Sequence, residues 1–255
     1  MQIGKFSRNN LQPIEITLDG VKMTKYVLSN DDCTADGANL TCPVGGRGLI
    51  HNTNYFDVTN PDFFKPELLS SVIEWDVDLS GTECGTIAQF TAVSMPAKLP
   101  FDGKSGLSIS DGLFYCDSVM GEFGGTECPE MTLMEANKHI LSTSAHVCDE
   151  PDENGHYKSC DWHGAGKNTA DEEDGFGPGP KYKIDTTKPF NVKVYLGEPS
   201  HDEFGYFNTV LSQGKEGLLV FNSNDEDYLK LMSDEVRDGL VFAISSWQGD
   251  DRWLR

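Results

Sequence analysis

The sequence has no long apolar run and few basic residues. No stretch approaches the roughly 18 consecutive apolar residues of a membrane-spanning helix, so we expect no membrane-embedded segment and no membrane partner. Only 20 Lys and Arg stand against 41 Asp and Glu, which gives a formal net charge of -21. Because phosphate backbones attract clustered cations, this balance also argues against a nucleic-acid partner.

Recognisable metal motifs are missing as well. The acidic runs at residues 148–153 and 171–174 lack the spacing of an EF-hand and are typical of solvated loops. The cysteines lack the CxxC spacing of zinc sites, as the segment CTADGANLTC at 33–42 illustrates. We therefore expect no metal and no cofactor.

The seven cysteines are better interpreted as disulfide partners in an oxidising compartment, with at least one left over because the number is odd. Asn39-Leu40-Thr41 is a glycosylation sequon, which is compatible with secretion. The first ten residues contain no apolar signal core, so we expect that any export signal has been removed or was never present. Together these features predict a secreted, extracellular protein.

Short segments of alternating polarity dominate what the sequence does contain. Residues 71–79, SVIEWDVDL, are the clearest case, because Glu74, Asp76 and Asp78 fall on one face and Trp75 joins apolar residues on the other. Such alternation predicts half-buried antiparallel strands. Further strands are expected at 14–18, 86–95, 190–196, 216–222 and 239–247, and Gly and Pro separate most of them.

Residues 225–239 have helical spacing instead, with Tyr228, Leu229, Met232 and Val236 predicted to pack one face of a surface helix on a sheet. Residues 149–180 are polar and predict long loops. Many short strands with long loops predict an all-β fold, a sandwich or jelly roll of two antiparallel sheets. A chain of this length commonly forms one such unit, so we expect a single domain over 1–255.

Residues 126–138, TECPEMTLMEANK, hold two glutamates in an apolar run. On a strand Glu130 and Thr132 share a face, whereas Glu135, five positions after Glu130, points the other way. A β-bulge after Thr132 would return Glu135 to the first face. Two carboxyl groups that face one cleft are the catalytic groups of a glycosidase. A separation of about 5–5.5 Å between them is typical of retaining enzymes, and one of about 6.5–9.5 Å is typical of inverting enzymes. Taken alone, such a pair is more often two surface charges.

The surrounding residues strengthen this interpretation. PEMTLMEANK resembles the catalytic segment E-M-D-I-W-E-A-N of glycoside hydrolase family 7. Further blocks resemble that family in the same order: VGGRGLI at 44–50, CGTIAQFTAVSM at 84–95, FYCDS at 114–118, SAHVC at 144–148, CDW at 160–162, FGPGPKYKIDTTKPFNV at 176–192 and AISSWQGDDRWL at 243–254. The resemblance implies a concanavalin-like β-sandwich that hydrolyses β-1,4-glucan with retention on its concave sheet.

The resemblance also implies roles for single residues. Glu130 matches the nucleophile and Glu135 the acid/base, which requires their pKa values to be pushed apart. His146 matches a histidine near the acid/base, although a purely structural histidine is the competing interpretation. Trp247 and Trp253 match tryptophans that stack on sugar rings.

Two more matched residues and one substitution complete the predicted site. Tyr115 and Asp117 either line the sugar site beside the nucleophile or support it from behind. Thr132 stands where the family motif has Asp. Because threonine can donate a hydrogen bond to Glu130 but cannot hold a proton at neutral pH, we expect reduced or redirected activity.

Other departures concern the loops and the cysteines. The tryptophans of the family's N-W-R-W segment and the loops that roof a tunnel have no counterpart, which favours an open cleft with internal attack or plain binding. The resemblance implies the disulfides Cys33–Cys42, Cys116–Cys128 and Cys148–Cys160. It leaves Cys84 unpaired, because the matching partner lies beyond the last shared block, and residues 2–8 are expected to replace a missing final strand.

Three functions remain open. The first is a secreted, monomeric, retaining endo-β-1,4-glucanase whose partner is a polysaccharide. The second, motivated by Thr132, is a lyase or hydrolase acting on another polysaccharide, for example one containing uronic acids. The third is a non-catalytic carbohydrate-binding protein, against which the retention of both glutamates argues.

Overall fold

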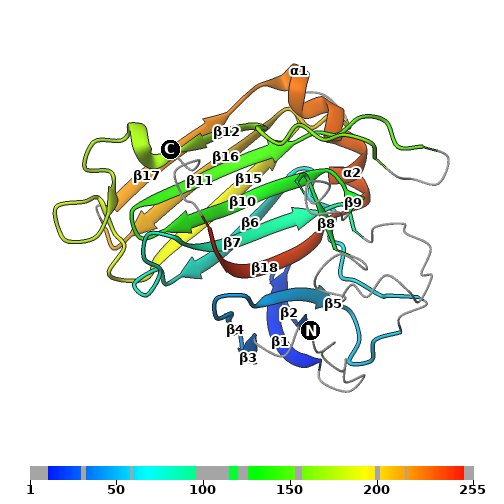
Figure 1. Ribbon diagram of the computed structural model, residues 1–255, viewed down its shortest axis with the longest axis horizontal. Helices are drawn as coiled ribbons and strands as arrows, with labels where there is room; N and C mark the ends of the chain where they lie inside the picture. The colour runs from blue at the N-terminus through cyan, green and yellow to red at the C-terminus, as the bar shows by residue number, and fades with distance from the viewer. Residues whose placement is uncertain are drawn as a thin grey trace.

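A computed structural model describes residues 11–29, 33–57, 60–95, 115–119, 126–152, 157–198, 202–215 and 217–249. Within these ranges the strands form two main antiparallel sheets (Figure 1). The larger has the order β1-β2-β5-β18-β7-β10-β11-β12, and the smaller has the order β17-β16-β15-β6. The predicted fold class is confirmed.

The large sheet is built from β1 (Gln12–Leu18), β2 (Val21–Ser29), β5 (Arg47–His51), β18 (Val241–Gln248), β7 (Thr86–Val93), β10 (Glu130–Asn137), β11 (Ile140–His146) and β12 (Ala165–Asn168). The small sheet contains β17 (Gly217–Ser223), β16 (Tyr206–Gln213), β15 (Phe190–Gly197) and β6 (Ser71–Val77). Short pairs are β3 (Thr34–Asp36) with β4 (Asn39–Thr41), β8 (Cys116–Asp117) with β9 (Thr126–Glu127), and β13 (Phe176–Gly177) with β14 (Ile184–Asp185). Each strand predicted from alternation lies within two residues of its expected ends.

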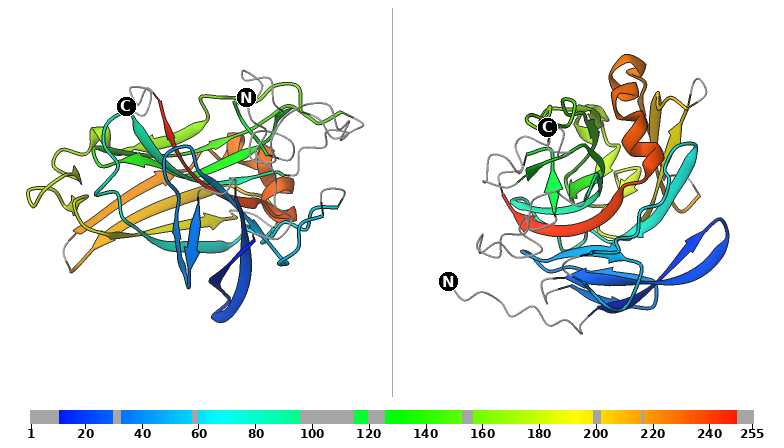
Figure 2. Two further views of the ribbon diagram at one scale, coloured as in Figure 1. Left: turned by 60° about the horizontal axis from the view of Figure 1, so that its bottom comes forward. Right: turned by 90° about the vertical axis from the view of Figure 1, so that its right-hand side faces the viewer.

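The core lies between the two sheets, because each contributes its apolar face to it. Met131 and Leu133 of β10 pack there with Val192 and Val194 of β15. The alternation predicted for β6 is confirmed, since Trp75 points inward and its ring meets that of Phe90 edge-on at 4.8 Å between centroids. The large sheet is strongly curved, as the bend of β18 shows (Figure 2).

The predicted helix at 225–239 has its expected place but is not continuous. It consists of α1 (Glu226–Leu229) and α2 (Ser233–Asp238), with a 3-10 turn (Lys230–Met232) between them. The hydroxyl of Ser233 donates to the carbonyl of Lys230 (2.7 Å) and accepts from the Phe204 amide (2.9 Å). Such a hydroxyl competes with the regular helical pattern, which explains the interruption.

The prediction of loops at 149–180 was partly wrong. Residues Ala165–Asn168 form β12, which adds an edge strand to the large sheet by pairing Gly166 with Ser144. A Cβ at Gly166 would lie 2.2 Å from the carbonyl oxygen of Thr143, so glycine permits this close pairing. Neither polarity nor alternation indicated this strand.

The three predicted disulfides are confirmed: Cys33–Cys42, Cys116–Cys128 and Cys148–Cys160. Cys84 is a free, exposed thiol, also as predicted. Residues 2–8, expected to replace a final strand, lie outside the described residues. Within the described part of the chain, no helix is long and apolar enough to cross a membrane.

Candidate active site

The predicted β-bulge is present in β10 and brings the two glutamates to one face of the large sheet. Glu130, Thr132 and Glu135 pair with Val93, Thr91 and Gln89 of β7 respectively, and the register shifts after Thr132. The three β7 residues are two positions apart and so share a face, and directly paired residues point the same way. The extra residue in β10 therefore restores Glu135 to the side of Glu130.

Three hydrogen bonds hold the Glu130 carboxylate, whose residue is only 3 % exposed. The backbone amide and the hydroxyl of Ser118 both donate to Oε2, at 3.2 and 3.0 Å. The Thr132 hydroxyl donates to Oε1 at 3.1 Å. Both oxygens are thereby fixed by donors, which suits a carboxylate that must keep one orientation.

Glu135 lies in a different environment. It is 7 % exposed, and burial, followed by the negative charges of Glu130 and Asp117, raises its pKa well above the usual value for a glutamate. A carboxyl in this position stays protonated at pH values where an ordinary glutamate is ionised. The two glutamates thus differ in surroundings in the way that a nucleophile and an acid require.

Asp117 adjoins Glu130 and is itself almost buried. Its Oδ1 accepts a hydrogen bond from the Val119 amide at 2.9 Å. Burial, followed by the charge of Glu130, raises the pKa of Asp117 to about 6. Asp117 therefore keeps its proton to a higher pH than an ordinary aspartate does.

Tyr115, two residues before Asp117, is 0 % exposed. The guanidinium of Arg47 stands 3.7 Å from the centre of its ring. Burial, followed by the charge of Asp117, raises the pKa of the Tyr115 phenol well above its usual value. Of the two interpretations of Tyr115, this position favours support from behind over contact with a sugar.

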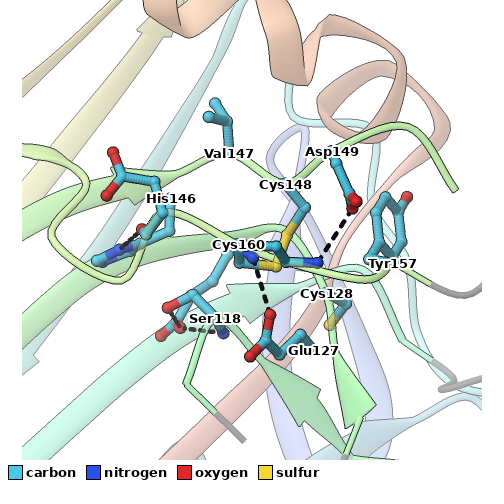
Figure 3. Close-up of a disulfide and its surroundings, with 12 residues drawn as sticks. Ser118, Glu127, Cys128, His146, Val147, Cys148, Asp149, Tyr157 and Cys160 are labelled. Atoms are coloured by element: carbon cyan, nitrogen blue, oxygen red, sulfur yellow. Dashed lines mark hydrogen bonds between the residues drawn. A yellow bond between two sulfur atoms is a disulfide. The ribbon is translucent and has the colours of Figure 1, made fainter. Parts of the chain in front are cut away.

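His146 lies directly opposite Glu130 on β11. Its Nδ1 lies 3.0 Å from the carbonyl oxygen of Asp161, and its Nε2 lies 2.7 Å from the Ser144 hydroxyl. Because a carbonyl oxygen only accepts, Nδ1 carries a proton. Figure 3 shows His146 to the left of the Cys148–Cys160 disulfide, on the strand that leads to Cys148. Both interpretations of His146, neighbour of the acid/base and structural histidine, are compatible with this arrangement.

Trp247 also lies on the face of the glutamates. It pairs with Ile87, which is two positions from Gln89 and thus on the same side of β7. It is half-buried against Ile87 and Ile140. Trp253, predicted to stack on a second sugar ring, lies outside the described residues.

Sequence reasoning assigned no role to Ser118 or Ser144. Both stood inside quoted motif matches, FYCDS and SAHVC, but nothing in their spacing from Glu130 or His146 indicated contact. Ser118 is twelve positions from Glu130 along the chain and donates twice to it. Only the pairing of β8 with β9 and the entry of the chain into β10 bring them together.

The hydrogen bond from Thr132 gives a testable expectation. Replacing Thr132 by Val removes the donor to Glu130 and should lower kcat roughly tenfold or more, because a hydrogen bond to a charged group contributes about 1.5–3 kcal/mol. Thr132→Ser keeps the hydroxyl and is expected to retain most of the rate. The measurement is initial rates on soluble β-glucan, with thermal unfolding to verify the fold. Equal rates for the two variants would contradict a role for this hydroxyl.

No model of a protein family matches this chain. Among curated proteins it is 26 % identical over 237 residues to "Endoglucanase type C" of Fusarium oxysporum, covering 72 % of this chain and 54 % of that protein. It is 25 % identical over 236 residues to "Endoglucanase 1" of Humicola insolens, covering 71 % and 56 %. The chain thus spans about half the length of the curated relatives that it matches.

Solved structures show the same fold. An endoglucanase I complexed with cellobiose superposes with a TM-score of 0.72 at 17 % identity, covering 95 % of this chain and 85 % of that chain. A family 7 cellobiohydrolase from Daphnia pulex superposes with a TM-score of 0.70 at 16 % identity, covering 97 % and 86 %. The resemblance to glycoside hydrolase family 7 inferred from the motifs is confirmed at the level of the fold, in a shorter chain of divergent sequence.

Proposed function

We propose that this protein is a retaining endo-glycoside hydrolase that cleaves β-1,4-glucan. The observation that carries the proposal is the bulge in β10, which sets Glu130 and Glu135 on one face of the curved sheet in unlike environments. Both carboxyl groups are buried, but three donors hold that of Glu130, whereas that of Glu135 has a raised pKa. This combination suits a double displacement better than it suits two structural acids.

In the proposed reaction, Glu130 attacks the anomeric carbon while Glu135 gives its proton to the departing glycosidic oxygen. The bond between the two sugars breaks, and a glycosyl ester on Glu130 forms. Glu135, now ionised, then takes a proton from water, whose oxygen attacks the same carbon and releases Glu130. Two inversions at one carbon give net retention.

The residues around the pair have supporting roles in this proposal. Ser118 and Thr132 aim the Glu130 carboxylate, and Trp247 offers an aromatic surface to a sugar ring. Asp117, whose negative charge contributes to the raised pKa of Glu135, helps to keep the acid protonated before attack. Thr132 cannot hold a proton, so Asp117 is the acidic neighbour of the nucleophile.

The substrate, the mode of attack and the location are part of the same proposal. The matched curated proteins bear the name endoglucanase, and a structure with the same fold contains cellobiose. Internal attack in an open cleft by a monomeric, single-domain enzyme is proposed accordingly. Three disulfides favour secretion into an oxidising compartment.

A panel of polysaccharides with mass analysis of the products tests the function. We expect saturated oligosaccharides of mixed length from soluble β-1,4-glucan, with the β-anomer appearing first in the NMR spectrum. Unsaturated products that absorb ultraviolet light would identify a lyase instead. Binding of glucan oligomers without cleavage at high enzyme concentration would identify a carbohydrate-binding protein.

A further inference from the structure

Trp162 is an exposed aromatic side chain on the turn that follows Cys160 and Asp161. It is 58 % exposed, and the imidazole of His163 lies against it with 3.8 Å between ring centroids and 32° between the planes. The imidazole covers one side of the indole, so much of the remaining aromatic surface faces solvent. A single exposed aromatic is ordinary on a protein surface, so its surroundings must decide whether it has a function.

A disulfide and several hydrogen bonds made by the residues next to Trp162 hold its turn in place. Before it, Cys160 is bonded to Cys148, and the amide of Cys160 donates to Oε2 of Glu127 at 2.8 Å (Figure 3). Within it, the Asp161 carboxylate accepts from the His163 amide at 3.1 Å and from the Tyr228 hydroxyl at 3.0 Å. A side chain on such a turn loses little conformational entropy when it binds a ligand.

The same turn is joined to the candidate active site. The carbonyl of Asp161, directly before Trp162, accepts from Nδ1 of His146 at 3.0 Å. His146 is the residue that pairs with Glu130. Gly164, at φ +63°, lies so close that a Cβ there would be 2.7 Å from Nδ1 of His146. The turn therefore packs directly on a histidine that adjoins the glutamates.

The exposed surface suits an uncharged, flat ligand. An indole backed by a second ring offers a plane to the C–H face of a pyranose, and the apolar contact needs no charged partner. Another exposed aromatic, Tyr195, lies on β15 of the small sheet, where it pairs with the exposed Val72. Tyr195 thus belongs to the sheet opposite the one that carries the glutamates.

We propose that Trp162, backed by His163, is a sugar-stacking platform that binds a further pyranose ring of the glucan on the β11–β12 side of the glutamate pair. This inference rests on the proposed function. It assigns substrate binding to a turn for which the sequence motifs indicated no role. It also makes the Cys148–Cys160 disulfide a support for substrate binding.

The test measures the affinity of cellohexaose by calorimetry in the Glu130→Gln background, where hydrolysis is blocked. Adding Trp162→Ala should raise Kd roughly threefold to tenfold, in line with the contribution of one aromatic contact. Trp162→Phe keeps an aromatic plane and should recover most of the affinity. Tyr195→Ala is the matched control and should leave Kd within about twofold. Circular dichroism and gel filtration verify fold and oligomeric state.

The outcomes separate this inference from the proposed function. Binding by Glu130→Gln with the same Kd in Trp162→Ala would overturn the platform alone. A change from dimer to monomer in Trp162→Ala, with Kd unchanged, would likewise overturn it and assign the indole to a protein contact. Failure of Glu130→Gln to bind cellohexaose, together with no hydrolysis by the parent protein, would overturn both proposals.

Discussion

Glu130→Gln is expected to lower the turnover of soluble β-glucan by at least about a thousandfold, because the amide cannot form the glycosyl ester. The fold should survive the change. A glutamine oxygen can accept from the amide and hydroxyl of Ser118, and its NH₂ can donate to the Thr132 hydroxyl. The measurement is the release of reducing ends over a long incubation, with cellohexaose binding measured in parallel.

Glu74→Gln is the matched control for this variant. It makes the same change of a carboxylate to an amide, but on the exposed face of β6. There the Glu74 carboxylate lies 3.1 Å from the Lys193 ammonium. Exposed ion pairs contribute about 0–1 kcal/mol, so both stability and turnover should stay near those of the parent. Undiminished turnover by Glu130→Gln would rule out the nucleophile assignment and with it the retaining mechanism.

The second large effect concerns Glu135. Glu135→Ala should lower the rate on unactivated glucan by about 10²–10⁴, the usual contribution of a general acid. A substrate with a dinitrophenyl leaving group needs no proton, so its first step should be nearly unaffected. The glycosyl ester would then accumulate, because no base activates water. Added azide, which needs no base, should restore turnover and yield the β-glycosyl azide, detectable by NMR.

The pH dependence tests the same residue. The raised pKa of Glu135 means that this carboxyl is protonated at low pH, as the proposed acid role requires, and loses its proton as pH rises through that pKa. The alkaline limb of the rate should therefore reflect Glu135 and should disappear in Glu135→Ala with the activated substrate. Retention of this limb with the same midpoint, or indifference to azide, would assign the acid role to another group.

Local regularity made several elements predictable from sequence. The alternation of β6 places Glu74 and Asp76 on one face and Trp75 on the other, because a strand has a period of two, and the apolar face is the one expected to pack on the core. The bulge in β10 was predictable because both glutamates could share a face only if one residue were added. The edge strand β12 was not predictable in this way, because its pairing depends on the close approach to β11 that the absence of a side chain at Gly166 permits.

The sequence by itself therefore predicted the sandwich, and its resemblance to a known family supplied the disulfide pairs and the two glutamates as the candidate pair. What only the tertiary structure decided is the surroundings of the two carboxyl groups. The pKa of Glu135 depends on burial and on charges from separate segments, and the Glu130 carboxylate is held by a serine twelve positions away. These effects act through space over a few ångströms, and separation along the chain does not report such distances.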